Sequence, residues 1–268
     1  MPPETLRNWT NVEVERFWNY WSRRTDAHPQ YFSYQVGGEV VKFAELFGIL
    51  RGRVIDYGCG PGFLLSHLLT RPDLEVYGFD TSVKSVAVCN DAYSAFPNFK
   101  SVSAGIVMDG TGEKFDTLFC TEVLEHCDDS YLAIVLSNVE CLLRPGGNAV
   151  VTVPNNEMLA KNLIYCPFCD TEYHQVQHQR SFTKISLRAT LERHGFHVDW
   201  CEELDFSLLK PRTKKRVTDV SMYDLYSAAK AGLERHVFPK KSPTERARVA
   251  QKVGGPHLAA VISSRVEP

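Results

Sequence analysis

The stretch VIDYGCGPGF, residues 54–63, decides how this chain folds. Its apolar beginning predicts a buried strand, and three glycines follow at alternate positions, Gly58, Gly60 and Gly62. The pattern FLLSHLLT comes next and predicts a helix. Glycine at such a turn permits backbone angles that other residues avoid and lets a ligand approach the main chain closely. The stretch therefore predicts a strand, a ligand-binding turn and a helix in succession.

The same alternation of strand and helix continues outward from this turn. LEVYGFD, FDTLFC and NAVVTVPN predict further strands, and YLAIVLSNVECLL predicts a helix that Asp128, Asp129 or Ser130 caps and RPGG ends. A helix at about 184–194, the strand FHVDWCEEL and a last strand, HLAAVISSR, complete the pattern. Strands and helices that alternate at this spacing predict an α/β fold, a parallel sheet with helices on both faces and right-handed crossovers.

Three segments interrupt or precede this pattern. Residues 1–35 form an aromatic-rich N-terminal cap, in which Phe17, Trp18 and Trp21 stand at helical spacing. That helix either only packs on the core or also closes over a ligand. Residues 36–268 form one domain with two insertions. The insertion at 156–183 interrupts the alternation, and the one at 207–255 is polar, basic in places and predicted helical.

Composition narrows the functional class. The net charge is −2, so the chain lacks the basic surplus of a dedicated nucleic-acid binder, and we expect no DNA partner and do not favour an RNA one. No apolar run approaches the roughly 20 residues of a membrane span, and the N-terminus lacks a signal-peptide pattern. We therefore expect a cytoplasmic protein whose 8 scattered cysteines are mostly thiols. The sequence carries no signal for the oligomeric state.

The spacing of the glycines distinguishes between classes of ligand. The pattern is G-x-G-x-G, whereas dinucleotide-binding turns have G-x-G-x-x-G and phosphate-binding loops need G-K-[ST]. Asp56 stands just before the turn, and Asp80 ends the next strand, where a carboxylate can accept both hydroxyls of a ribose. The site therefore suits a nucleoside cofactor that has no pyrophosphate.

Four stretches in this order, VIDYGCGPG, VYGFDTS, FDTLFCTEVLEHCDD and LLRPGGNAVVTVPN, resemble the motifs of class I S-adenosylmethionine-dependent methyltransferases. The resemblance covers roughly residues 36–206 and the last strand. It is strongest to the branch that includes ubiquinone-biosynthesis O-methyltransferases and related bacterial small-molecule methyltransferases. It implies a Rossmann-like seven-stranded, mostly parallel sheet of order 3-2-1-4-5-7-6 with the last strand antiparallel.

The resemblance also implies which residues bind S-adenosylmethionine. The backbone of the glycine turn would approach the methionine end, an acidic residue would anchor the amino group, the residues after the second strand would hold the ribose, and those after the fourth strand would line the far side. In this chain these are, in the same order, Gly58, Cys59, Gly60 and Gly62; Asp56; Asp80, Thr81 and Ser82; and Cys120, Thr121 and Glu122.

The methyl acceptor is predicted to be a small molecule, methylated on a hydroxyl oxygen, such as a sugar or secondary metabolite. His126 follows the fourth strand and is a candidate general base for that hydroxyl, because histidine titrates near neutral pH. Alternatively Glu122, Glu125, His126 and His178 hold a divalent metal, as in the RNA 3′-terminal ribose methyltransferases that resemble this branch. A third alternative is a cofactor-binding partner subunit without transferase activity.

The stretch CPFCDTEYHQVQH, residues 166–178, lies in the first insertion. Cys166, Cys169, His174 and His178 offer two thiolates and two imidazoles, the donor set of a tetrahedral structural zinc. The spacing is too short for a DNA-reading finger and predicts a zinc-stapled loop beside the acceptor pocket. Two alternatives stay open: a metal-free loop in which His174 or His178 is a catalytic base, and a loop with neither role.

Overall fold

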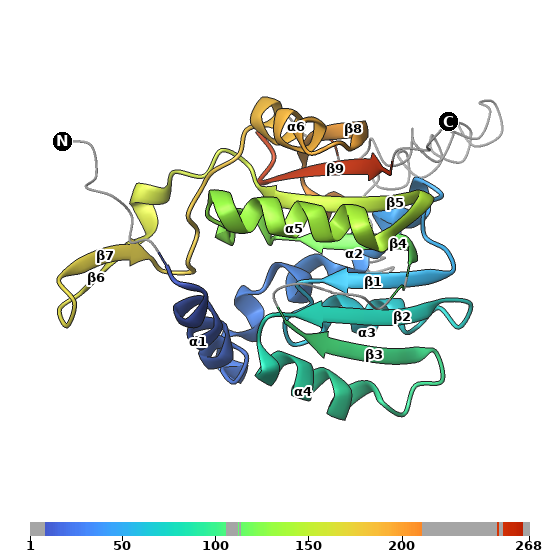
Figure 1. Ribbon diagram of the computed structural model, residues 1–268, viewed down its shortest axis with the longest axis horizontal. Coiled ribbons are helices and arrows are strands. Elements are labelled where there is room, and N and C mark those ends of the chain that lie inside the picture. Colours follow the sequence, from blue (N-terminus) through green and yellow to red (C-terminus); the bar gives the residue numbers. More distant parts are fainter. Residues whose placement is uncertain (1–8, 106–111, 113, 211–250, 252–253, 265–268) are drawn as a thin grey trace, which may run out of the picture.

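A seven-stranded sheet with helices on both faces forms the centre of the protein (Figure 1). The computed structural model describes residues 9–105, 112, 114–210, 251 and 254–264. The strands are β1 (Arg53–Tyr57), β2 (Glu75–Asp80), β3 (Phe99–Ala104), β4 (Phe115–Thr121), β5 (Leu143–Pro154), β8 (His197–Leu204) and β9 (His257–Ser263). They lie in the order β3-β2-β1-β4-β5-β9-β8, and β9 is antiparallel to both neighbours. Counted along the chain this is 3-2-1-4-5-7-6, so the predicted fold is confirmed.

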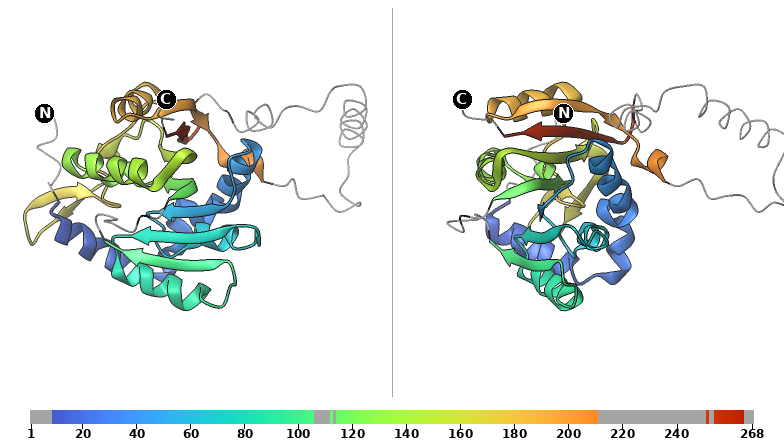
Figure 2. Two further views of the ribbon diagram at one scale, coloured as in Figure 1. Left: turned by 45° about the vertical axis from the view of Figure 1, so that its right-hand side comes forward. Right: turned by 90° about the vertical axis from the view of Figure 1, so that its right-hand side faces the viewer.

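The helices divide between the two faces of this sheet (Figure 2). One face carries α5 (Asp129–Leu142) and α6 (Lys184–Arg193), and the other carries α2 (Phe32–Leu46), α3 (Phe63–Leu68) and α4 (Val83–Tyr93). Successive strand residues point to opposite faces, so Val54 belongs to the core beneath α2 and α3, and Ile55 to the core beneath α5. Burial on both faces explains why the strand sequences are almost continuously apolar.

Side-chain caps fix where the helices begin. The Asp128 carboxylate accepts a hydrogen bond from the Tyr131 amide at 2.7 Å and starts α5, as one of the predicted caps. Ser82 starts α4 in the same way, and Thr10 forms a capping box with Glu13 at the start of α1 (Asn11–Trp21). The Ser82 cap holds the beginning of α4 beside the end of β2, where the cofactor site was predicted.

The segment after β5 leaves the sheet and forms a hairpin of its own, which projects at one end of the molecule (Figure 1). Its strands are β6 (Leu163–Cys166) and β7 (Thr171–His174). Short 3₁₀ helices complete the connections: η1 (Thr25–Gln30), η2 (Leu124–His126), η3 (Leu159–Asn162) and η4 (Phe206–Leu209). Most of the predicted helical insertion at 207–255 lies outside the described residues. Among the described helices, none has the length and apolar character needed to cross a membrane.

Candidate functional site

A cavity of about 320 Å³ lies at the carboxyl edge of the parallel strands. Two groups of residues face each other across it. The glycine turn and the end of β2 contribute Gly58, Cys59, Gly60, Asp80 and Thr81 at one side. The segment after β4 and the loop after the hairpin contribute the other side, and α1 and η1 add aromatic walls: Thr121, Glu122, Glu125, His126, His178, Trp18, Trp21 and Tyr31. Open α/β sheets bind ligands at this edge.

Only glycine fits at two positions of the turn. Gly58 has φ +82°, and a Cβ placed there would lie 2.4 Å from Cγ2 of Val123. Gly62 has φ +87°, and its Cβ would lie 2.6 Å from Cε2 of Tyr93. Both the backbone angle and the lack of space exclude a side chain, so the G-x-G-x-G pattern reflects a turn that must pack tightly against its neighbours.

Two buried aspartates stand beside this turn. Asp80 accepts hydrogen bonds from the Gly60 amide at 2.8 Å and the Ser82 amide at 2.7 Å. Burial raises its pKa to about 6, against the lowering effect of these two hydrogen bonds. Asp56 is 1% exposed, and burial together with the charge of Asp80 raises its pKa to about 8. Its Oδ1 has no hydrogen-bond partner, which fits a cationic group that approaches from the cofactor.

Of the residues predicted to bind the cofactor, the structure places Gly58, Cys59, Gly60, Asp80, Thr81, Thr121 and Glu122 on the cavity wall. Asp56, Gly62, Ser82 and Cys120 stand behind that wall. A second cavity of about 250 Å³ shares Val14, Thr81 and Tyr131 with the first and extends along the ends of β2 and β3. It is lined by Val12, Val14, Glu15, Thr81, Val83, Ala104, Gly105 and Tyr131.

The raised pKa values predict that affinity for S-adenosylmethionine rises with pH. The cofactor's ammonium group favours the ionised carboxyls, so binding must release the protons that Asp80 and Asp56 hold at pKa values of about 6 and about 8. Between pH 5 and pH 7 we expect the Kd to fall by up to about tenfold per pH unit for each proton released, and so most steeply below pH 6, where both carboxyls hold a proton. Calorimetry in buffers of different ionisation enthalpy measures the proton release, and a Kd independent of pH in this range contradicts the prediction.

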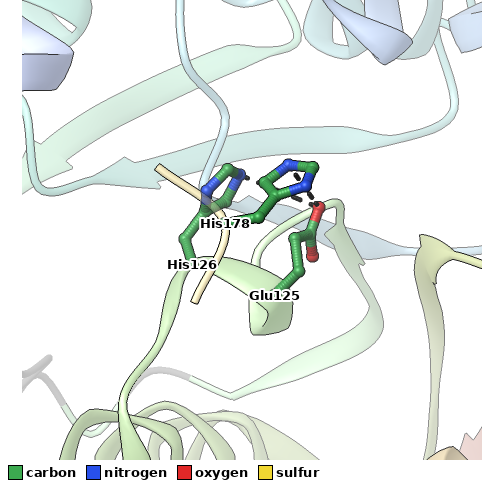
Figure 3. Close-up of side chains that lie close together, drawn as sticks. All are labelled: Glu125, His126 and His178. Atoms are coloured by element: carbon green, nitrogen blue, oxygen red, sulfur yellow. Dashed lines mark ion pairs between the residues drawn. The ribbon is translucent and has the colours of Figure 1, made fainter. Parts of the chain in front are cut away.

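A carboxyl group and two imidazoles of the cavity lining, Glu125, His126 and His178, lie close together (Figure 3). Oε1 of Glu125 lies 3.7 Å from Nε2 of His126 and 3.9 Å from Nε2 of His178. Glu125 is 1% exposed, and neither of its carboxyl oxygens has a hydrogen-bond partner. Desolvation raises the pKa of Glu125 far above its ordinary value and lowers that of His126 far below. The three side chains thus form a buried polar group that lacks a partner on the cavity side.

Backbone contacts bring His178 to this cluster from more than fifty residues away. The Gln179 amide donates to the carbonyl of Glu125 at 2.8 Å, and Nε2 of Gln177 donates to the carbonyl of His126 at 3.0 Å. Nε of Arg180 donates to the carbonyl of Cys127 at 2.6 Å. The segment 177–180 therefore binds along η2, and His178 between these contacts is directed toward Glu125.

The helix α1 lines part of the cavity with Val14, Trp18 and Trp21. Nε1 of Trp18 donates to Oε1 of Gln177 at 3.0 Å, and the Trp18 and His126 rings lie 4.8 Å apart, edge to face. Oδ1 of Asn19 accepts from Oγ of Ser82 at 2.7 Å. The helix is thus held at both sides of the cavity, by the histidine segment and by the start of α4.

Replacing Trp18 by Phe should loosen this attachment of α1. The phenyl ring keeps much of the packing, but Oε1 of the buried Gln177 loses its donor, which costs about 1–3 kcal/mol. We expect a melting temperature lower by several degrees and a higher KM for the acceptor. Thermal unfolding and steady-state kinetics measure both. The matched control is Trp9→Phe, outside α1 and away from the cavity lining; equal effects of the two changes would show that the bond to Gln177 is not the cause.

The predicted zinc ligands are not brought together, which corrects the ligand set. Cys166 pairs with Thr171 at the outer end of the hairpin, whereas His174 pairs with Leu163 at its base. Three residues of strand separate these pairs, roughly 10 Å. His174 and His178 face Glu157 instead. Among the described residues, the groups whose ligand atoms lie within 4.8 Å of one another are Glu125, His126, His178 and Glu157, His174, His178, neither with a cysteine.

The three histidines predicted as candidate bases occupy different positions relative to the cavity. His126 and His178 line the cavity, whereas His174 is 1% exposed and stands behind His178. Glu157, Gln177 and His257 also belong to the site or its surroundings and were not predicted from the sequence. Glu157 could have been predicted as a site residue, because it follows β5 at the carboxyl edge of the sheet, where ligands bind. His257 approaches within 3.7 Å of Glu122, whose positive φ of 53° marks a strained backbone at the end of β4.

The sheet order, the glycine turn and the acidic residues at the carboxyl ends of β1 and β2 define a class I S-adenosylmethionine-dependent methyltransferase. A family described as a methyltransferase domain matches residues 30–200, more than half of the chain, and the protein belongs to that family. The ubiquinone biosynthesis O-methyltransferase of Rhizobium rhizogenes is 34% identical over 114 residues, which are 41% of this chain and 44% of that protein. The match thus spans less than half the length of this curated relative.

Solved structures share the fold at low sequence identity. The 1,6-didemethyltoxoflavin-N1-methyltransferase of Burkholderia thailandensis, bound to its substrate and S-adenosylhomocysteine, has a TM-score of 0.59 at 14% identity over 98% of this chain and 94% of its own. The [4+2]-cyclase SpnF has a TM-score of 0.61 at 14% identity over 98% and 100%. Since one is named an N-methyltransferase and the other a cyclase, the fold alone does not assign the acceptor.

Proposed function

We propose that this protein transfers the methyl group of S-adenosylmethionine to a hydroxyl oxygen of a small molecule. The observation that carries the proposal is the single cavity in which the glycine turn and Asp80 face Glu125, His126 and His178. The first group suits the cofactor, and the second offers nitrogen and oxygen atoms that can accept a proton. The O-methyltransferase relatives support oxygen as the acceptor atom.

Different residues would bind the cofactor and accept the proton. Asp80 would hold the ribose, Asp56 would attract the ammonium group, and the second cavity would take the adenine ring between Val83 and Gly105. When bound, the cofactor supplies a methyl group that its sulfonium already activates. The acceptor oxygen forms a bond to that methyl carbon as the carbon–sulfur bond breaks, and the hydroxyl proton passes to Nε2 of His178.

The cavity walls indicate what kind of molecule presents this hydroxyl. Trp18, Trp21, Phe32 and Val176 are apolar members of the lining, and no Lys or Arg is among the lining residues that the structure describes. We therefore propose an acceptor with a flat or apolar body and no strong negative charge at the buried end. Large aromatic side chains contact such a body over a wide area.

Two measurements test this function. Calorimetry with S-adenosylmethionine shows whether the cofactor binds, and transfer of labelled methyl to a panel of phenols, catechols, sugars and amines shows the acceptor class. Binding together with transfer to a hydroxyl compound supports the proposal. Binding without turnover over the whole panel favours the alternative of a partner subunit, and no binding refutes both.

A second candidate function is metal-dependent methylation of an RNA 3′-terminal ribose, and one observation favours its metal requirement. The ligand atoms of Glu125, His126 and His178 lie within 4.8 Å of one another, and both oxygens of Glu125 are buried without a partner. These residues would hold a divalent cation, which lowers the pKa of a bound hydroxyl. Full activity after dialysis against a chelator, or RNA 3′ ends that stay sensitive to periodate, would exclude this candidate.

A further inference from the structure

The strongest new feature of the site lies behind His178, on the side away from the cavity. Glu157, from the segment after β5, and His174, at the end of β7, contact the imidazole of His178 from there. We propose that Glu157 and His174 are positioning residues that hold His178 as the tautomer with its proton on Nδ1, so that the lone pair of Nε2 faces the acceptor. This inference deepens the proposed function and rests on it only for its kinetic consequence.

The contacts of Glu157 indicate which ring nitrogen of His178 carries the proton. Its Oε2 makes a close contact with Nδ1 of His178, and its Oε1 accepts from Nδ2 of Asn162 at 3.3 Å. Nitrogen atoms of His178, His174 and Asn162 surround its two oxygens, so the geometry suits a carboxylate, which only accepts hydrogen bonds. The atom of His178 that faces it must be the donor, so Nδ1 carries a proton.

The contacts of His174 indicate the tautomer of this second ring. The backbone amide of His178 donates to Nδ1 of His174 at 3.2 Å, so that nitrogen is the acceptor and the proton of a neutral His174 is on Nε2. This Nε2 lies 3.3 Å from Oε1 of Glu157. The two imidazoles stack with centroids 4.6 Å apart and planes inclined by 12°, and His174 is 1% exposed. Nε2 of His174 and Nδ1 of His178 thus both lie beside the same carboxylate.

This arrangement also distinguishes a hydrogen-bond network from a second metal site. Glu157, His174 and His178 have ligand atoms close enough for a cation. However, a neutral imidazole has one lone pair on its ring nitrogens, and the backbone amide of His178 already uses that of His174. Nε2 of His174 is then a donor and not a ligand, which favours the network.

The consequence is a histidine that is oriented before the acceptor binds. Nε2 of His178, left unprotonated, lies 3.9 Å from Oε1 of Glu125 on the cavity wall. In this state it can take the hydroxyl proton, and it can equally bind a cation. Carboxylates that fix a histidine tautomer in this way occur behind catalytic and metal-binding histidines. Loss of such a partner lowers metal affinity or activity about 10- to 100-fold.

Nuclear magnetic resonance on protein labelled with ¹⁵N-histidine tests the tautomer without any substrate. Long-range ¹H–¹⁵N correlations distinguish an N–H nitrogen from an unprotonated one, and His178→Asn assigns the signals. We expect the wild-type His178 to show Nδ1 protonated and Nε2 unprotonated at neutral pH. A wild-type signal with the proton on Nε2 overturns the proposal, whether or not the protein transfers methyl groups.

Glu157→Gln tests the kinetic consequence. The neutral amide can present either its donor or its acceptor to His178, so the variant should show both tautomers and a kcat about 10- to 100-fold lower, with the KM within about threefold. The matched control is Glu172→Gln, an exposed residue of β7, which should match the wild type. Unchanged tautomer and kcat in Glu157→Gln refute the proposal, and if that variant does not fold, the wild-type spectrum still decides.

Discussion

Asp80→Ala should weaken the binding of S-adenosylmethionine about 10²- to 10⁴-fold. In the proposed complex the carboxylate accepts from the two ribose hydroxyls, and each hydrogen bond to a charged group contributes about 1.5–3 kcal/mol. The substitution also removes the acceptor for the Gly60 amide, at 2.8 Å, and so releases the glycine turn. Titration calorimetry or fluorescence quenching of the nearby tryptophans measures the change in Kd.

Asp91→Ala is the matched control, because this aspartate is exposed on α4 and faces away from the cavity. It should bind the cofactor as the wild type does. Asp80→Asn separates the two effects of Asp80→Ala, since the amide oxygen can still accept from Gly60 while the charge is lost. A Kd for Asp80→Ala within threefold of the wild type would place the ribose elsewhere and contradict the proposed cofactor site.

The fold could be predicted because its signals are local. The apolar strands, the glycine turn and the helix caps each occupy fewer than fifteen consecutive residues, and the alternation of strands and helices leaves few topologies. Asp128 shows this well: a polar residue before an apolar helix pattern was expected to cap it, and its carboxylate does so at 2.7 Å. The antiparallel last strand came from the family resemblance and not from the residues themselves.

Site residues could be predicted only where they lie at the ends of the sheet's strands. Asp80 ends β2 and Glu122 directly follows β4, so topology alone brings them to one edge. The grouping of Cys166 and Cys169 with His174 failed because spacing in sequence does not reveal a hairpin: strand pairing places the cysteines at its far end. Glu157 was missed for the opposite reason, since its partners His174 and His178 reach it only through that hairpin.

Of the residues on the acceptor side, His178 should matter most for catalysis. His178→Ala removes the nitrogen that faces the acceptor, and loss of a general base costs about 10²- to 10⁴-fold in kcat/KM. Cofactor affinity should stay within threefold, because His178 stands across the cavity from the glycine turn. Single-turnover methyl transfer at saturating cofactor measures the loss. The control is His197→Ala, whose side chain is 73% exposed on β8.

The same variant also separates the two candidate functions, because a base and a metal ligand respond differently to added imidazole. If His178 takes the proton, free imidazole can enter the space left by the alanine and restore part of the rate in the presence of a chelator. If His178 holds a cation with Glu125 and His126, rescue requires the divalent metal, and the chelator abolishes it. In either case Glu157→Gln should lower the wild-type rate through His178, but in a His178→Ala background it should add little, since the residue it orients is gone.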